Sequence, residues 1–521
     1  MLKFTGRTLF ILTAFIWLFT LAVSGDPADT PEDMLLFPGH NAVNVNPDTR
    51  LKLVFSGKPA PGRSGCIRIY DAADNNLADI LDMAVPPGPA APTPSPDAVY
   101  TPVPYDYTGG NFTNKNTKPG TPSGMALPTP DTYHLTIIGG FTDGFHFHPV
   151  ITGENTAVIY LHNNILEYDK TYYVEIDPGV LTVDGRSFTG IKGKNRWRFS
   201  TKKAPPPLKK QEIVVSADGT GDFNTVQGAV DFIPDHGKSR VTVFIRKGIY
   251  EEIVYFRNKS NITFLGEDRD KVLICYENNE IFNPHPVNIK TNEVPGTFPS
   301  RRAVFAADNS EDIHIVNLSI KNSSYGQAEG LLLNGRRFII KEVNITGSGD
   351  ALQSNGTAFF SGCRITGDGD TILGRGPAFF KNCELASYGP YMWIRNTQAN
   401  HGNVFVDCLF RTRGKGSTVI ARSPVNGAKT YPYSEAVLIN CRLSGIDPAG
   451  WGAIGGDVKN IRYWEYGSRN MDGTPADTAK RHPASRQLTM EHDAGLIAGY
   501  SSPVFVLDGW DPEADTDPAL D

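Results

Sequence analysis

Residues 359–385 read FFSGCRITGDGDTILGRGPAFFKNCEL, a stretch in which one apolar segment returns in altered form after twenty residues. The same pattern recurs in IHIVNLSI (313–320), FIIKEVNI (338–345), VFVDCLF (404–410) and VLINCRL (437–443). One register of the pattern holds Leu318, Val343, Cys363, Cys383, Cys408 and Cys441, at intervals of 25, 20, 20, 25 and 33 residues. Short apolar strands that repeat at this spacing between Gly, Asn and Asp turns are typical of a solenoid.

The strands themselves indicate which solenoid to expect. No helical periodicity lies between them, which argues against a leucine-rich repeat and favours a parallel β-helix over residues 211–515. A sandwich or a propeller is the alternative, and it would use antiparallel hairpins with Asn-Gly turns, which are mostly missing from this sequence.

Two acidic turns share the repeat. Asp350 lies in GDAL and Asp370 in GDTIL, twenty residues apart. If twenty residues make one coil, the two carboxyl groups lie side by side on neighbouring coils, which stack at the strand spacing of about 4.8 Å. Carboxylates that close raise each other's pKa, so one is expected to hold a proton while the other is ionised, as acid–base chemistry requires. Turn aspartates that bond their own backbone are the alternative, and Asp368 is interpreted as one.

The N-terminal half has a different pattern. Residues 30–203 alternate apolar and polar residues in short runs between turn residues, which predicts a smaller β-sandwich with a Pro-rich insertion. The order of these runs resembles the immunoglobulin-like modules appended to bacterial secreted enzymes. Residues 204–210 form a linker by composition, since a Pro run stands between lysines.

The first 25 residues have the layout of a secretory signal peptide. Lys3 and Arg7 precede an apolar run that ends in small residues. A membrane anchor is the alternative, but the run is short for a span of about 20 residues. We therefore expect an exported protein, periplasmic or extracellular, with no membrane attachment after cleavage.

Composition indicates the number of domains, the class of partner and the state of the cysteines. The chain has 521 residues, of which 40% are apolar and 20% charged, so a packed core in two or three domains is expected. A formal net charge of −6 argues against nucleic acid as a partner. Of the six cysteines, four occupy one position of the repeat, which favours free, buried thiols over disulfides. The acidic end DGWDPEADTDPALD (508–521) is interpreted as a solvated tail.

An ordered set of motifs over residues 211–451 resembles the pectinesterase (pectin methylesterase) family. These motifs are SADGTGDFNTVQGAVDFIP (216–234), KGIYEE (247–252), GQAEGLLLNGRRF (326–338), GSGDAL (347–352), GDGDTILG (367–374), VIARSP (419–424) and IDPAGW (446–451). The resemblance implies a right-handed, single-stranded parallel β-helix of the pectin-lyase-like type. It also implies a secreted carbohydrate esterase that acts on pectin (homogalacturonan) as a monomer, without a metal or an organic cofactor.

The resemblance assigns roles by position. Asp370 is the implied nucleophile, Asp350 the implied general acid and base, and Arg422 the implied ion-pair partner of Asp370. Gln327 is the implied donor to the oxyanion. Trp451 is the implied aromatic contact with sugar, and the chain also offers Trp393, Tyr391 and Arg375 as candidate substrate contacts.

The sequence also departs from the family pattern. Gly349 stands where the family has a second oxyanion glutamine, and the loss of one such donor can cost about 10²–10³ in rate. Thr371 and Leu373 replace the aromatic pair of the nucleophile motif. Two alternatives to a pectin methylesterase therefore stay open: an esterase or thioesterase for another acyl substrate, and a non-catalytic polysaccharide-binding β-helix.

Overall fold

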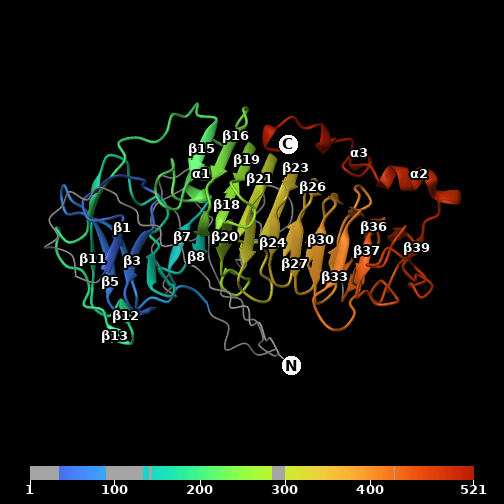
Figure 1. The fold of residues 1–521 in the computed structure, drawn as a ribbon, viewed down its shortest axis with the longest axis horizontal. Helices are drawn as coiled ribbons and strands as arrows, with labels where there is room; N and C mark the ends of the chain where they lie inside the picture. The colour runs from blue at the N-terminus through green and yellow to red at the C-terminus, as the bar shows by residue number, and fades with distance from the viewer. Residues whose placement is uncertain (1–33, 90–132, 140–143, 284–299, 428, 521) are drawn as a thin grey trace, which may run out of the picture.

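A computed structural model describes residues 34–89, 133–139, 144–283, 300–427 and 429–520. The predicted signal peptide and most of the Pro-rich insertion lie outside these residues. The described strands form two regions arranged end to end, with the N-terminal sheets at one end and a long stack of coils beyond them (Figure 1).

The N-terminal region consists of two main β-sheets that share one core. The first is antiparallel and contains, in spatial order, β1 (Met34–Phe37), β3 (Leu51–Phe55), β10 (Thr156–Ile159) and β9 (Val150–Thr152). The second contains β2 (Ala42–Val45), β14 (Arg198–Thr201), β11 (Thr171–Ile176), β5 (Cys66–Asp71) and β6 (Leu77–Asp82). Smaller sheets are made by β13 (Arg186–Ser187), β12 (Leu181–Val183) and β4 (Pro59–Pro61), and by β7 (Leu135–Ile137) and β8 (Gly144–His146). The immunoglobulin-like assignment stays a prediction.

The C-terminal region is a parallel β-helix, which confirms the predicted fold class. Its larger sheet follows the order β15 (Glu212–Val215), β16 (Val241–Ile245), β19 (Ser260–Gly266), β21 (Phe305–Val316), β23 (Leu331–Lys341), β26 (Ala358–Ser361), β29 (Ala378–Lys381), β32 (Asn403–Val406), β36 (Glu435–Ile439), β38 (Arg462–Tyr466) and β39 (Arg486–Gln487). Beside this path, β18 (Val254–Arg257) pairs with β21, and β23 continues through β25 (Leu352–Ser354) and β28 (Ile372–Gly374) to β31 (Met392–Ile394).

A second parallel sheet closes the coils on another side. It runs through β17 (Gly248–Glu251), β20 (Val272–Tyr276), β22 (Ser319–Asn322), β24 (Asn344–Thr346), β27 (Arg364–Gly367), β30 (Glu384–Ser387), β33 (Leu409–Thr412) and β37 (Arg442–Ser444). A short antiparallel pair, β34 (Val425–Asn426) and β35 (Lys429–Thr430), projects from the coils. In this arrangement, residues one repeat apart lie side by side on neighbouring coils.

The repeated apolar positions point into the interior of the coils. Phe360, Phe380 and Phe405 stack with ring centroids 4.5 Å apart at each step. All six cysteines are free thiols, and the four of the repeat are buried. Like residues therefore stack on like residues through the core, which gives the coils one register.

A residue in the left-handed conformation precedes each stacked position. These residues have φ between 53° and 63° and are Asn317, Glu342, Gly362, Asn382, Asp407 and Asn440. Asn, Asp and Gly hold five of these six positions, because they tolerate this conformation better than other residues.

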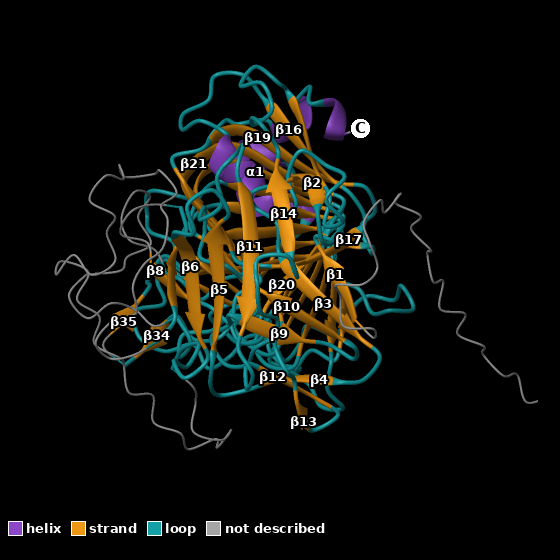
Figure 2. Cartoon of the chain, turned by 90° about the vertical axis from the view of Figure 1, so that its left-hand side faces the viewer, coloured by secondary structure: helices purple, strands orange, loops and turns teal. Residues whose placement is uncertain are grey.

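Helix α1 (Val226–Phe232) covers the first coil and joins the two regions (Figure 2). Asp48 of the N-terminal region accepts hydrogen bonds from the N–H groups of Asn224 and Thr225, at 2.8 and 2.7 Å, and from the Thr225 hydroxyl. Glu252 accepts from the N–H groups of Val226 and Gln227, at 2.9 Å each. Carboxylates at a helix N-terminus accept from its free N–H groups and interact favourably with the positive end of the helix dipole. The N-terminal region therefore helps to hold α1 over the first coil.

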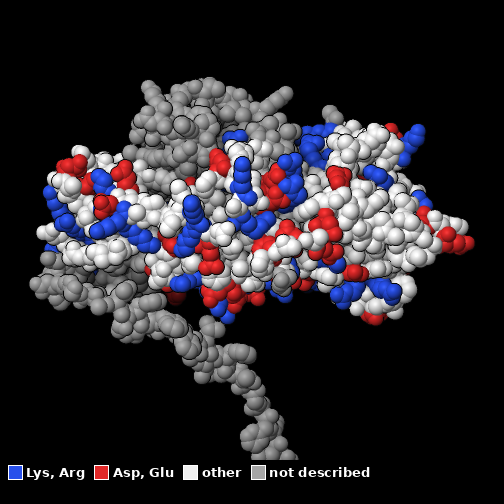
Figure 3. Space-filling view, turned by 90° about the horizontal axis from the view of Figure 1, so that it is seen from above, with Lys and Arg blue, Asp and Glu red and all other residues white. Residues whose placement is uncertain are grey.

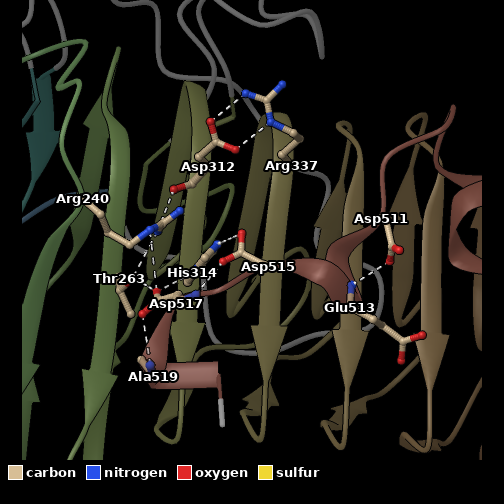
Figure 4. Close-up of polar contacts among 10 residues, drawn as sticks. All are labelled: Arg240, Thr263, Asp312, His314, Arg337, Asp511, Glu513, Asp515, Asp517 and Ala519. Atoms are coloured by element: carbon tan, nitrogen blue, oxygen red, sulfur yellow. Dashed lines mark hydrogen bonds and ion pairs between the residues drawn. The ribbon is translucent and has the colours of Figure 1, made fainter.

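The C-terminal segment returns along the coils, and residues 508–520 are only partly solvated, where the sequence predicts a solvated tail. It contains α2 (Met490–Tyr500), α3 (Pro503–Val506) and the 3₁₀ turns η2 (Pro512–Ala514) and η3 (Pro518–Leu520), and it ends over β19 and β21 (Figure 1). Figure 4 shows Asp517 between Thr263 and His314, with Oδ2 at 2.7 Å from His314 Nδ1. Asp508, Asp511 and Glu513 are exposed, whereas Asp517 is buried and hydrogen-bonded, which the acidic composition does not reveal.

The charged surface is mixed. Basic and acidic side chains are interspersed over the face seen in Figure 3, where the described residues show no field of a single sign. In the described part of the chain, no helix is both long enough and apolar enough to cross a lipid bilayer.

Candidate active site

Asp350 and Asp370 lie on neighbouring coils. Gly349 and Gly369 form a parallel bridge, and the Asp350 N–H donates to the Gly369 carbonyl at 3.2 Å. Both aspartates have left-handed backbone, with φ of 66° and 43°. Each is followed by a strand, β25 or β28, and these two strands pair in register. The repeat therefore places two carboxyl groups next to each other, one coil apart.

Asp370 is held by Arg422. The Nη1 atom of Arg422 donates to Asp370 Oδ2 at 2.5 Å, and both side chains are partly exposed. Burial raises the pKa of Asp370, while the hydrogen bond and the charge of Arg422 oppose that rise. The guanidinium therefore favours the ionised form of this carboxyl group and fixes its orientation.

Asp350 has a different environment. It is 5% exposed, and its Oδ2 accepts from Arg302 Nη2 at 3.0 Å. Burial raises the pKa of Asp350 to about 6, the nearby Asp370 adds to the rise, and the charge of Arg302 opposes it. At weakly acidic pH this carboxyl group can hold a proton that it can transfer.

Gln327 lies on the coil before Asp350. It forms a parallel bridge with Gly349, and its side chain is exposed to solvent. Gly349 itself has no room for a side chain, because a Cβ atom there would lie 2.9 Å from the Gly326 carbonyl oxygen. Gln353 is paired with Leu373 on the next coil, and Leu373 is paired with Trp393 on the coil after that. These three side chains lie on the face of the strands that points away from the core.

Arginine and aromatic side chains gather on that outward face. The guanidinium of Arg422 lies 4.6 Å from the centre of the Trp393 ring, and that of Arg395 lies 5.4 Å from it. Tyr431 packs edge-on against Trp393, and Arg375 lies 5.7 Å from the Tyr431 ring. Trp393 is 8% exposed, so its ring mainly supports these arginines. The cluster adds positive charge beside Asp370.

Two predicted substrate contacts are wrong. Tyr391 is 0% exposed and packs edge-on against Phe410 inside the coils. Trp451 is 1% exposed and stacks on Tyr463 at 4.7 Å. Both rings belong to the core, so neither presents a face to a sugar.

Three charged residues near the acid pair were not predicted. Arg302 contacts Asp350 from 48 positions away in the sequence, and Glu329 contacts Arg302. Arg395 acts electrostatically on both aspartates. In the sequence, Arg302 lies in RRAVF (301–305) and Glu329 lies in QAEG (327–330), but no spacing rule connects these two segments. Among the described residues, no group of three or more His, Cys, Asp or Glu side chains is placed to hold a metal ion.

Comparisons with known proteins agree with the motif pattern. Residues 212–495 match the family model described as Pectinesterase. Similar curated proteins include "Probable pectinesterase/pectinesterase inhibitor 19" of Arabidopsis thaliana, 29% identical over 291 residues that make up 53% of this chain and 52% of that protein. "Probable pectinesterase 30" of the same plant is 28% identical over 303 residues, 55% of this chain and 58% of that protein. Among solved structures, "Pectin methylesterase from Carrot" aligns with a TM-score of 0.47 and 22% identity over 59% of this chain and 95% of that chain.

The family-model match lies within the β-helix. The chain spans about half the length of the first two curated relatives it matches. The matched residues 212–495 begin at β15 and include both aspartates, Arg422 and Gln327. With more than half of its residues in the family model, the chain belongs to the pectinesterase family.

Proposed function

We propose that the protein is an exported pectin methylesterase, which hydrolyses methyl esters of homogalacturonan to pectate and methanol. One observation carries the proposal: two carboxyl groups lie on neighbouring coils, and each has its own arginine partner. Asp370 is oriented by Arg422 at a partly exposed position, whereas Asp350 is buried and holds its proton to higher pH. One group is therefore suited to attack and the other to proton transfer.

The first step forms an acyl-enzyme. An Asp370 oxygen attacks the ester carbonyl carbon, and the carbonyl electron pair moves onto oxygen to give a tetrahedral oxyanion. Collapse of this intermediate breaks the bond to the methoxy group, whose oxygen takes the proton of Asp350 and leaves as methanol. Asp370 is then joined to the substrate as a mixed anhydride, and Asp350 is ionised.

The second step restores the enzyme. Asp350 takes a proton from water while the water oxygen attacks the acyl carbon of the substrate. The bond to Asp370 breaks, Asp370 leaves as a carboxylate, and Asp350 again holds its proton. The exposed amide of Gln327, one coil before Asp350, is the side chain assigned to stabilise the oxyanion.

The arginine cluster suits an anionic polymer. De-esterified galacturonate units carry carboxylates. Arg375 is partly exposed beside Tyr431, and Arg395 acts electrostatically on both aspartates. A planar guanidinium binds a carboxylate at two points, which favours the partly exposed Arg375 as a substrate contact, whereas Arg395 is 7% exposed and adds positive charge beside the site. The N-terminal sandwich is proposed as a spacer or docking module, and the protein is proposed to act as a monomer.

Methanol release from highly methylated pectin tests this function. The wild type is expected to release methanol and to show much slower hydrolysis of a model acetyl ester and a model thioester. Rapid hydrolysis of either model compound without methanol release would overturn the pectin assignment. Pectin binding without turnover of any of the three would overturn the catalytic one.

Two observations favour a second candidate function, an esterase or thioesterase for another acyl substrate. Gly349 has no room for the second oxyanion glutamine, and Trp451 is buried in the core. The first removes an oxyanion donor and the second an aromatic contact with sugar, both of which the family resemblance implies. The same three-substrate assay separates the two candidates.

A further inference from the structure

Arg302 contacts three carboxyl groups at once. Its Nη2 atom donates to Asp350 Oδ2 at 3.0 Å, and its Nε atom lies 2.7 and 2.8 Å from the two oxygens of Glu329. Its Nη1 atom lies 3.4 Å from Glu280 Oε2. Arg302 is 7% exposed and Glu329 is 0% exposed. One buried guanidinium therefore serves the proposed acid and two further acidic side chains.

This arrangement cannot balance all of its charges. One positive charge can offset one ionised carboxylate, and burial penalises every charge left over. Burial raises the pKa of Glu329 to about 7, and the charge of Arg302 opposes the rise. Glu329 and Asp350 share one guanidinium, and a charge on Asp350 raises the pKa of Glu329. The two groups therefore lose their protons one after the other, and the pair keeps one proton after the first is lost.

We propose that Arg302 and Glu329 are positioning residues that keep a proton available on Asp350. Arg302 orients the Asp350 carboxyl group, and Glu329 occupies the same guanidinium so that Asp350 is not held fully ionised. This inference rests on the proposed function, in which that proton goes to the departing methanol oxygen. Neither residue has to touch the substrate, and Glu329 has no exposed surface with which to do so.

The charges that face Asp350 come from several coils. They are Arg302, Asp370, Arg395 and Arg422 around Asp350, with Glu280 and Glu329 around Arg302. Replacement of Glu329 by Gln leaves the positive charge of Arg302 facing Asp350 with less competition, which favours ionised Asp350. Replacement of Arg302 by Gln has the opposite effect, because Glu329 then repels a charge on Asp350.

The pH dependence of kcat/KM for methanol release tests the inference. Acylation needs protonated Asp350, so activity falls on the alkaline side as the pair loses its last proton. In Glu329→Gln this alkaline limb is expected to move down by about one pH unit or more, because an opposite charge lowers a carboxyl pKa by about 1–3 units. Glu329→Asp should return the alkaline limb toward its wild-type pH, and Arg302→Gln should move it to higher pH.

A matched control separates this effect from lost stability. Glu252 is also a buried glutamate whose pKa burial raises to about 7, but it binds the N-terminus of α1. Glu252→Gln should change the melting temperature and leave the alkaline limb in place. If Glu329→Gln does not fold, Glu280→Gln is the substitute, with a smaller downward shift expected because Glu280 is partly exposed and lies farther from Arg302.

An infrared titration detects the proton on Asp350 directly, without an activity assay. The band of protonated carboxyl groups that disappears in Asp350→Asn reports Asp350, and it should be lost at lower pH in Glu329→Gln than in the wild type. The inference would be overturned if both the alkaline limb of the pH profile and the infrared band of Asp350 stay in place in Glu329→Gln. In that case, methanol release by the wild type would still support the proposed function. A shifted band in a protein without methanol release would support the inference and reject the proposed function.

Discussion

Gly349 shows how closely two turns approach each other beside the acid pair. A Cβ atom at this position would lie 2.9 Å from a backbone oxygen of Gly326, and a backbone atom cannot rotate away as a side chain can. Insertion of the glutamine that the family resemblance implies would therefore displace the turn that holds Asp350. In the proposed mechanism, the oxyanion is therefore stabilised without that side chain.

A pair of glycine substitutions tests this crowding. Gly349→Ala is expected to lower the free energy of unfolding by about 1–3 kcal/mol, the usual cost of overpacking. Gly369 is the matched control, because a Cβ atom there meets its nearest neighbour at 3.7 Å, an ordinary contact. Urea denaturation of both variants checks the difference. Equal stability of the two would contradict the crowding at Gly349.

At the residue level, the sequence predicted the groups that lie within motifs. Asp350, Asp370 and Arg422 were found because each lies in a short motif and the motifs occur in a fixed order. Arg302 and Glu329 were not found, since their contacts depend on which coils meet. Tyr391 and Trp451 were assigned to the surface because composition does not reveal which side of a coil a ring faces. The catalytic roles stay predictions.

At the level of the elements, left-handed turn residues set the path of each coil. Asn382 has φ of 54° and directly precedes Cys383, which stacks between Cys363 and Cys408. A residue with a Cβ atom and no local hydrogen-bonding side chain is disfavoured in this conformation by about 1–2 kcal/mol. The turn residue and the stacked core residue therefore act together in each repeat.

Substitutions at Asn382 test this role. Asn382→Ala is expected to lower the free energy of unfolding by about 1 kcal/mol, whereas Asn382→Gly should cost less, because glycine adopts positive φ without a steric penalty. Thermal unfolding of the two variants is the measurement. A glycine variant less stable than the alanine variant would mean that the asparagine side chain, and not its backbone, holds the turn.

The repeat was predictable at this level because its cause is local. Period, turn residues and stacked core positions follow from the sequence itself, and the pairing of β26 with β29 over Ala358–Ser361 has the twenty-residue offset that the sequence predicts. The C-terminal segment was not predictable, because its position depends on single contacts such as that of Asp517 with His314. Those contacts have no periodic signal.

At the level of the whole molecule, the N-terminal sandwich and the β-helix are joined through the cap of α1. Asp48 supplies acceptors to Asn224 and Thr225, so the first coil is completed by a residue from the other region. The exposed end of a β-helix is a sheet edge with unpaired backbone groups, and such edges need a cover. The sandwich therefore contributes to the stability of the β-helix.

Loss of this cap has a predicted cost. Asp48→Ala should lower the free energy of unfolding by about 2–3 kcal/mol, because it leaves helix N-terminal donors without their acceptor. Asp74→Ala is the control, since Asp74 is exposed and bonds only within its own turn. Differential scanning calorimetry of both variants is the measurement. A cost no larger for Asp48 than for Asp74 would contradict the proposed link between the regions.

Methanol release by three aspartate variants tests the central claim most directly. With highly methylated pectin, Asp370→Asn should lose nearly all activity, Asp350→Asn should lose about 10²–10⁴-fold in kcat, and Asp368→Asn should stay close to wild type. Asp368 is the internal control, because it lies in the same turn and instead contacts Ser348 and Arg413. Methanol release that persists in Asp370→Asn would contradict the account.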